Sequence, residues 1–191
     1  MIKAIIFDCF GVLTEDKWRA FRESIKDENT ANAAQSLNHA YDRGFITKQE
    51  FVTETARLTG VDSDFLNSLL DNEQSKNVAL LDWIRTQRSS YKIGLLSNVG
   101  TNWIEESLLT KEEYALFDVK VLSFQVGLTK PSTEIFLLAA SRLGVRPDEC
   151  LFIDDVESYC LAANNTGMLT IYYQTLEGCL TQAEALLSSN S

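Results

Sequence analysis

The sequence has few prolines, a single histidine and a deficit of positive charge. Its 191 residues include two prolines, which argues against a long disordered linker. The histidine, His39, lies in a polar helical stretch, so we expect it at the surface, and any histidine-based catalytic triad would have to use it. The net charge of −10 argues against general nucleic-acid binding, which needs a basic surface.

Cysteine is also sparse, and its spacing excludes the common metal motifs. The four cysteines form no Cys-x-x-Cys pair and show no metal-ligand spacing. We therefore expect Cys9, Cys150, Cys160 and Cys179 to be buried free thiols in a reducing compartment.

Long hydrophobic runs are missing as well. The first apolar stretch begins at Ala4 and runs directly into Asp8, so it is too short for a signal peptide, and no other run approaches the length of a membrane span. These features predict a cytoplasmic protein with no membrane partner. The chain is long enough for one compact core and a small accessory domain, and its 45% hydrophobic content is ordinary for a globular protein.

Beyond residue 75, short apolar runs alternate with amphipathic segments. Together with the opening run, they predict five strands, at residues 2–7, 91–96, 119–122, 150–153 and 168–172. Helices are expected between and after them, at residues 78–85, 102–109, 132–143, 156–164 and 180–187. Strands that alternate with helices are typical of an α/β fold, here a Rossmann-like, doubly wound parallel sheet.

Residues 15–74 show no convincing strand pattern. They predict four helices, at residues 18–25, 30–41, 47–58 and 62–70, and the third begins with a capping box from Thr47 to Glu50. We therefore expect an α/β core formed by residues 1–14 and 75–191, with a small helical cap domain, residues 15–74, inserted after the first strand.

Polar side chains follow several of the predicted strands. Asp8 ends the first, Ser97 and Asn98 follow the second, and the pair Asp154 and Asp155 follows the fourth. Since the carboxyl ends of parallel strands meet at one edge of a sheet, these side chains are expected to share a crevice, together with Lys130 from a nearby loop. Each residue alone also has a structural interpretation, such as a helix cap or a solvated charge.

Clustered carboxylates at low dielectric repel one another, and a hard divalent cation relieves this repulsion. The pattern predicts a Mg²⁺ site formed by Asp8, Asp154, Asp155 and the carbonyl of Phe10. Asp8 is the candidate nucleophile, and Gly11 provides a tight turn beside it. Ser97, Asn98 and Lys130 are expected to hold phosphate oxygens, which together describes phosphoryl transfer through an aspartyl-phosphate. Glu157 is expected to be a first-turn helix charge.

Four ordered segments resemble the motifs of the haloacid dehalogenase (HAD) superfamily of hydrolases: IIFDCFGVLT, IGLLSN, GLTKPSTEIF and CLFIDDVESYCLAANNTGM. The resemblance covers essentially the whole chain, including a small cap after Thr14. It implies a Rossmann-like core, Mg²⁺, Asp8 as nucleophile, Ser97 and Lys130 on the transferred group, and Asp154 and Asp155 at the metal.

The chain departs from that pattern at Phe10. Phosphatases of the superfamily usually have a second Asp there, which protonates the leaving oxygen, although some sugar-phosphate phosphatases have Gly and the dehalogenases have an aromatic residue. We therefore expect a Mg²⁺-dependent phosphatase that prefers leaving groups of low pKa, with Glu15 and Asp16 as the first substitutes for the acid. An L-2-haloacid dehalogenase and a catalytically weakened phosphometabolite-binding or regulatory protein remain alternatives.

The cap is expected to set specificity for a small phosphorylated molecule, because it covers the crevice and excludes water. Arg19, Arg22, Tyr41 and Arg43 are the candidates that face this substrate. The sequence fits a monomer or a homodimer.

Overall fold

The computed structural model describes residues 1–71 and 76–188, and its centre is a five-stranded parallel sheet. The strand order is β3-β2-β1-β4-β5, and every pair is parallel. The strands are β1 (Ala4–Phe7), β2 (Lys92–Ser97), β3 (Val119–Leu122), β4 (Cys150–Asp154) and β5 (Leu169–Tyr172). The predicted doubly wound, Rossmann-like α/β fold is therefore confirmed.

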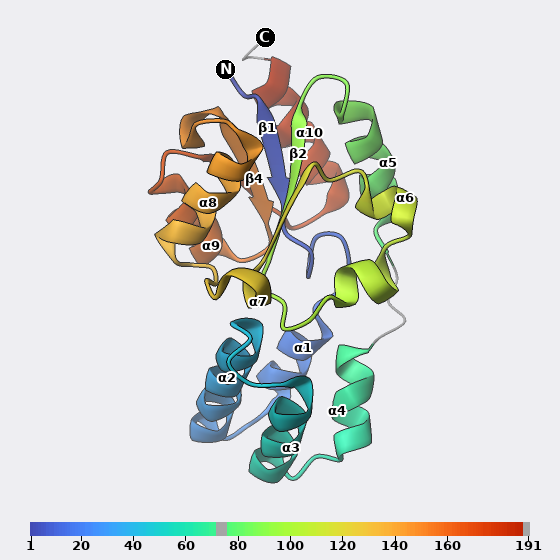
Figure 1. Ribbon diagram of the computed structural model, residues 1–191, viewed down its shortest axis with the longest axis vertical. Helices are drawn as coiled ribbons and strands as arrows, with labels where there is room; N and C mark the ends of the chain where they lie inside the picture. The colour runs from blue at the N-terminus through green and yellow to red at the C-terminus, as the bar shows by residue number, and fades with distance from the viewer. Residues whose placement is uncertain (72–75, 189–191) are drawn as a thin grey trace.

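The residues of β1 show how the sheet is covered on both faces. Ile5 and Phe7 point to one face, where they pack with residues of α5 and α10, whereas Ala4 and Ile6 point to the other, where they pack with residues of α8 and α9. All four side chains are completely buried, as expected for a strand with helices on both sides. Figure 1 shows these two helical layers on either side of the sheet. The core helices are α5 (Val78–Gln87), α6 (Lys111–Tyr114), α7 (Ser123–Val126), α8 (Thr133–Leu143), α9 (Glu157–Asn164) and α10 (Leu176–Ser188).

Four helices between β1 and β2 form a separate bundle at the carboxyl end of the sheet, which we call the cap (Figure 1). They are α1 (Lys17–Ser24), α2 (Glu28–Asp42), α3 (Lys48–Thr59) and α4 (Ser63–Leu70). The bundle has its own small core, in which the Tyr41 ring stacks on Phe51 at 4.9 Å and Trp18 packs edge-on against Phe51. The predicted capping box of α3 is present. The predicted domain boundary between residues 74 and 75 lies outside the described residues.

The segment between β2 and β3 differs from the prediction. The helix expected at residues 102–109 is a π-helix, Ile104–Leu108, and a short helix that was not predicted, α6, follows it. The break has a local cause, because the Thr110 side chain accepts from the backbone of Glu113 and the Glu113 side chain accepts from that of Thr110, which starts a new helix. A second short helix that was not predicted, α7, follows β3 directly and ends before the loop that carries Lys130.

Three further predictions, two about the core and one about the cap, can be compared with the structure. All four cysteines are free and buried, as expected. The last helix, α10, begins at Leu176 rather than at residue 180, and α2 begins at Glu28 rather than at residue 30, where the side chain of Asp27 caps it. Within the described ranges, the helices are all too short or too polar to span a bilayer.

Candidate active site

The order of the strands brings the carboxylates together. From β1 the chain builds the sheet outward to β2 and β3, and then returns to the other side of β1 with β4 and β5, so β1 and β4 flank the point where the winding reverses. Ligands of open α/β sheets bind at this point, beyond the carboxyl ends of the strands. Phe7 pairs with Ile153, which places Asp8 beside Asp154. Oxygen atoms of Asp8, Asp154 and Asp155 lie within 4.8 Å of one another.

Lys130 lies between two of these carboxylates. Its Nζ is 2.7 Å from Oδ1 of Asp8 and 2.6 Å from Oδ2 of Asp154, and only 1% of the residue is exposed. The two carboxylates raise the pKa of Lys130 against the opposing effect of burial, so the ammonium keeps its proton. Burial raises the pKa of Asp8, and the neighbouring carboxylates add to this effect while Lys130 opposes it. Three carboxyl groups thus share one buried ammonium, and their mutual repulsion raises the pKa of Asp8.

Asn98 fixes the loop that carries Lys130. Its Oδ1 accepts from the backbone N–H of Lys130 at 2.9 Å, and its Nδ2 donates to the carbonyl of Lys130 at 3.0 Å. The Asn98 side chain therefore binds both the backbone N–H and the carbonyl of Lys130. Asn98 also borders the cavity. The rings of Phe152 and Tyr159 lie 5.6 Å and 5.1 Å from Lys130 Nζ and enclose the ammonium. Asn98 accordingly positions Lys130, a role that the sequence did not indicate.

Asp155 is held by the cap and passes very close to Gly11. Arg19 of α1 donates to both oxygens of Asp155, at 2.6 and 3.2 Å. A Cβ atom at Gly11 would overlap with the Asp155 carboxylate, and the φ of +87° at Gly11 is one that other residues rarely adopt. Gly11 is thus required by the approach of Asp155. It does not border the main cavity but a shallow hollow that it shares with Glu15.

Ser97 is the last residue of β2 and is completely buried. Its Oγ has no hydrogen-bond partner among the described residues. A buried hydroxyl without a partner is costly, and a phosphate oxygen is a suitable acceptor for it. Ser97 is not among the residues that border the cavity of the described structure.

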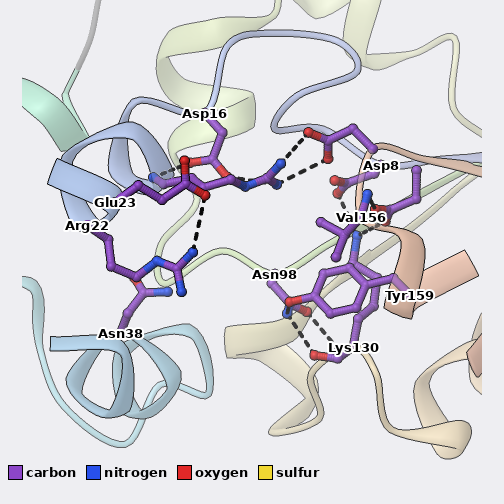
Figure 2. Close-up of polar contacts among 12 residues, drawn as sticks. Asp8, Asp16, Arg22, Glu23, Asn38, Asn98, Lys130, Val156 and Tyr159 are labelled. Atoms are coloured by element: carbon purple, nitrogen blue, oxygen red, sulfur yellow. Dashed lines mark hydrogen bonds and ion pairs between the residues drawn. The ribbon is translucent and has the colours of Figure 1, made fainter. Parts of the chain in front are cut away.

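A cavity of about 270 Å³ lies between the cap and the carboxyl ends of the strands. Figure 2 shows Asp8, Asn98, Lys130 and Tyr159 on the core side of this site, with Asp16, Arg22 and Asn38 on the cap side. The ring of Phe10 lies in the wall, stacked on Trp103 at 5.8 Å. Trp103 is only 7% exposed and belongs to the hydrophobic core.

The predicted cap residues do not all face the cavity. Arg19, Arg22 and Tyr41 do, but Arg43 is exposed and donates instead to the hydroxyl of Thr129 at 3.3 Å. His39 is exposed, as expected, and it also lies in the cavity wall, 2.8 Å from the amide nitrogen of Gln35. Glu157 is exposed in the first turn of α9, which agrees with its interpretation as a helix charge.

The sequence reasoning missed Asp42, although it selected the residues on both sides. Asp42 is the last residue of α2, is 7% exposed and borders the cavity. Burial raises its pKa to about 7. The sequence did contain a signal. A carboxylate in the last turn of a helix interacts unfavourably with the helix dipole, so Asp42 at this position indicates a role other than helix stability.

The donor set of the cluster fits a hard divalent cation. Asp8, Asp154 and Asp155 offer only carboxylate oxygens, no soft ligand lies among them, and the three carboxyl groups outnumber the adjacent cations Lys130 and Arg19. Mg²⁺ prefers such oxygen ligands and commonly combines carboxylates with water and substrate phosphate. The residues present therefore fit the predicted metal.

Comparison with known proteins agrees with this chemistry. The haloacid dehalogenase-like hydrolase family matches residues 2–167. The D-ribitol-5-phosphate phosphatase of Bacteroides thetaiotaomicron is 30% identical over 212 aligned positions, which cover 100% of both chains. A putative phosphatase of Bacillus subtilis, YhcW, is 38% identical over 88% of this chain and 81% of its own.

A solved structure has a similar fold. A HAD family enzyme of Bacteroides thetaiotaomicron in complex with magnesium is 26% identical, with a TM-score of 0.71 over 91% of this chain and 93% of that one. The chain also matches the mouse acyl-CoA dehydrogenase family member 10, at 33% identity over 76% of this chain, but it spans only 14% of that protein's length.

Proposed function

This chain belongs to the haloacid dehalogenase-like hydrolase family, and from that premise we propose that it is a Mg²⁺-dependent phosphohydrolase acting on a small phosphorylated metabolite. The observation that carries the proposal is the cluster of Asp8, Asp154 and Asp155 around the buried ammonium of Lys130. A carboxylate nucleophile beside a cation site and a fixed positive charge is suited to phosphoryl transfer, in which positioning and electrostatics provide most of the rate enhancement.

Each residue of the cluster has a part in the proposed reaction. One oxygen of Asp8 attacks phosphorus and becomes the aspartyl-phosphate. Lys130 faces the negative charge of the transferred group, and the unpartnered hydroxyl of Ser97 is available for one of its oxygens. Asp8, Asp154, Asp155 and the carbonyl of Phe10 would hold Mg²⁺, which supplies positive charge to the phosphoryl oxygens when bound.

The substrate class follows from the cavity and the relatives. A volume of about 270 Å³ suits a small metabolite, and the cap provides hydrogen-bonding side chains such as Arg22, Gln35 and Asn38 for its other end. The similarity to a D-ribitol-5-phosphate phosphatase supports a phosphorylated sugar or polyol. Phe10 provides no proton for the leaving group, as the stacked ring has no acidic hydrogen to give.

The aromatic residue at position 10 is the one observation that favours a second candidate, a dehalogenase, because halide leaves without a proton. Three carboxylates within 4.8 Å of one another would repel an incoming haloacid, and this repulsion favours the phosphohydrolase. A weakened binding protein would bind phosphorylated compounds without turnover.

The test is a screen of phosphate release from aryl, alkyl and sugar phosphates, with and without Mg²⁺, next to halide release from L-2-haloacids. We expect Mg²⁺-dependent phosphate release, and we expect Asp8→Asn to abolish it without altering the circular dichroism spectrum, because the variant has no nucleophile. Turnover that survives in Asp8→Asn would reject the phosphoenzyme. Halide release by the wild-type protein would favour the dehalogenase.

A further inference from the structure

The end of α2 packs directly against the core. Tyr41 packs so tightly on Gly100 that a Cβ atom there would overlap with its ring, and Arg43 donates to Thr129 in the loop before α8. Helix α2 also packs against α7. Asp42 lies between these two contacts, so it is held at the boundary between the cap and the core.

Asp42 is a buried carboxylate, and among the described residues only one of its two oxygens accepts a hydrogen bond. Asn38, one turn earlier, donates to its Oδ2 at 2.9 Å, and no other hydrogen bond to its carboxylate occurs within residues 1–71 and 76–188. Asp16, before α1, faces it and raises its pKa, whereas Lys130 on the core side lowers it. Burial raises the pKa of Tyr159 on α9, and Asp42 adds slightly to this effect. Asp42, Lys130 and Tyr159 all border the same cavity, so the carboxyl group lies on the cap side of the site.

The other candidate proton donors are engaged by a cation, lie outside the cavity wall or favour their neutral form. Asp16 is engaged by Arg19, whose backbone N–H and Nη2 donate to its two oxygens at 2.8 and 3.0 Å. Glu15 is exposed and borders the separate hollow beside Gly11. Burial lowers the pKa of His39, with Arg43 and Arg22 adding to it, so its ring is mostly neutral near pH 7. Among the carboxylates of this wall in the described residues, Asp8 is the proposed nucleophile and Asp42 remains.

We propose that Asp42 is the proton donor to the leaving group, supplied by the cap because Phe10 cannot act in this way; the inference rests on the proposed phosphohydrolase function. The bond from Asp8 to phosphorus forms while the bond from phosphorus to the leaving oxygen breaks, and the carboxyl proton of Asp42 passes to that oxygen, so the product leaves as a neutral alcohol. Water then attacks phosphorus and displaces Asp8, and the Asp42 carboxylate accepts the proton of that water. Both carboxyl groups return to their starting states.

This role predicts a dependence on the leaving group that differs from the expectation based on Phe10 alone. With Asp42 in place, the wild-type protein hydrolyses alkyl phosphates, whose leaving alkoxide needs a proton. Because the donor must be protonated and its pKa in the free protein is about 7, the kcat/KM for an alkyl phosphate falls as the pH rises through about 7.

The experiment compares wild type, Asp42→Asn and the control Asp64→Asn on p-nitrophenyl phosphate and on D-ribitol 5-phosphate within a panel of alkyl phosphates. Asn keeps the size of Asp and an oxygen that can accept from Asn38, but it has no acidic proton. Asp64 is an exposed acidic residue of the same cap. We expect Asp42→Asn to lower kcat on alkyl phosphates about 10²–10⁴-fold, the usual contribution of a general acid, and to have much less effect on the aryl phosphate.

The pH profile separates proton donation from simple binding. In Asp42→Asn, the decline near pH 7 should disappear from the alkyl profile, and Asp64→Asn should behave as wild type. An equal loss on aryl and alkyl phosphates, or a rise in KM alone, would overturn the inference and leave the phosphohydrolase intact. Wild-type activity on p-nitrophenyl phosphate but on no alkyl phosphate would overturn it too. No phosphatase activity on any compound would instead reject the proposed function itself.

Discussion

At the scale of single residues, Lys130 shows why a buried charge is informative. An ammonium that is 1% exposed is tolerated only because Asp8 and Asp154 lie within 2.7 Å of it. The same ammonium lowers the pKa of Asp8 against the larger opposing effect of burial. Removing the ammonium leaves the two carboxylates buried without this cation, and removing a carboxylate takes one of its two anionic partners from the ammonium. Either change therefore lowers the free energy of unfolding.

We therefore expect Lys130→Met to destabilise the metal-free protein by about 3–5 kcal/mol, the usual effect of breaking a buried ion pair. Met fills a similar volume, so the loss reflects charge rather than a cavity. Urea denaturation in the presence of a chelator measures the difference, with the exposed Lys26 changed to Met as the matched control. A stability within 1 kcal/mol of the control would show that the buried ion pairs of Lys130 do not contribute to the stability of the folded protein.

The sequence indicated which carboxylates gather at the site better than it indicated their hydrogen-bond partners. Asp8 and Asp154 stand at the ends of apolar strands, and strand order brings such ends together, so the structure has them adjacent as the pattern suggested. The bond partners were not predictable, because they depend on how loops return to the sheet. That Asn98 contacts substrate stays a prediction, and nothing in the sequence indicated that its amide also holds the backbone of Lys130, 32 positions away.

At the scale of elements, the contact between α2 and the core decides what lies opposite the nucleophile. Hydrophobic periodicity located α2 within two residues, since it depends on the sequence of the helix itself. It did not show that Asp42 would be buried, because that depends on the docking of the cap onto α7 and onto the loop after β2. The π-helix at Ile104–Leu108 was also missed. A new helix begins at the Thr110 cap, and this interrupts the helical periodicity that predicted one helix over residues 102–109.

The close packing of Tyr41 on Gly100 gives a test of this docking. We expect Gly100→Ala to lower kcat/KM on the best substrate roughly 10-fold, because the added methyl group overlaps with the Tyr41 ring and displaces the end of α2. Gly100 has no unusual φ, so the backbone itself accepts Ala. Steady-state kinetics on Gly100→Ala, Tyr41→Ala and the double variant form the test.

The double variant tests whether the Gly100→Ala effect on kcat/KM comes from overlap with the Tyr41 ring. If the methyl group acts through the ring, Gly100→Ala has little further effect once Tyr41 is Ala, and the interaction between the two sites lies in the usual range of about 0.5–3 kcal/mol. Effects that simply add would mean that the end of α2 is not pressed onto Gly100 in the working protein.

At the scale of the whole molecule, the strand order creates a site that concentrates negative charge in a protein whose net charge is already −10. An anionic substrate enters such a site only if positive charge is supplied locally. Lys130 and Arg19 supply part of it, and both are already paired with carboxylates. The fold therefore gains from a bound divalent cation in stability as well as in chemistry.

We accordingly expect Mg²⁺ to raise the melting temperature. A cation that binds only the folded protein stabilises it by about 2.7 kcal/mol at 100 times its dissociation constant, which is roughly 5–10 °C for a domain of this size. The shift should be lost in Asp154→Asn, which removes one charge of the cluster, and retained in Asp64→Asn, which changes an exposed acid of the cap. The melting temperature is measured by scanning calorimetry across a Mg²⁺ titration at constant ionic strength, so that general screening does not contribute. Equal shifts in both variants would mean that the stabilisation comes from the acidic surface as a whole, and the three clustered carboxylates would then not be the place where the cation binds.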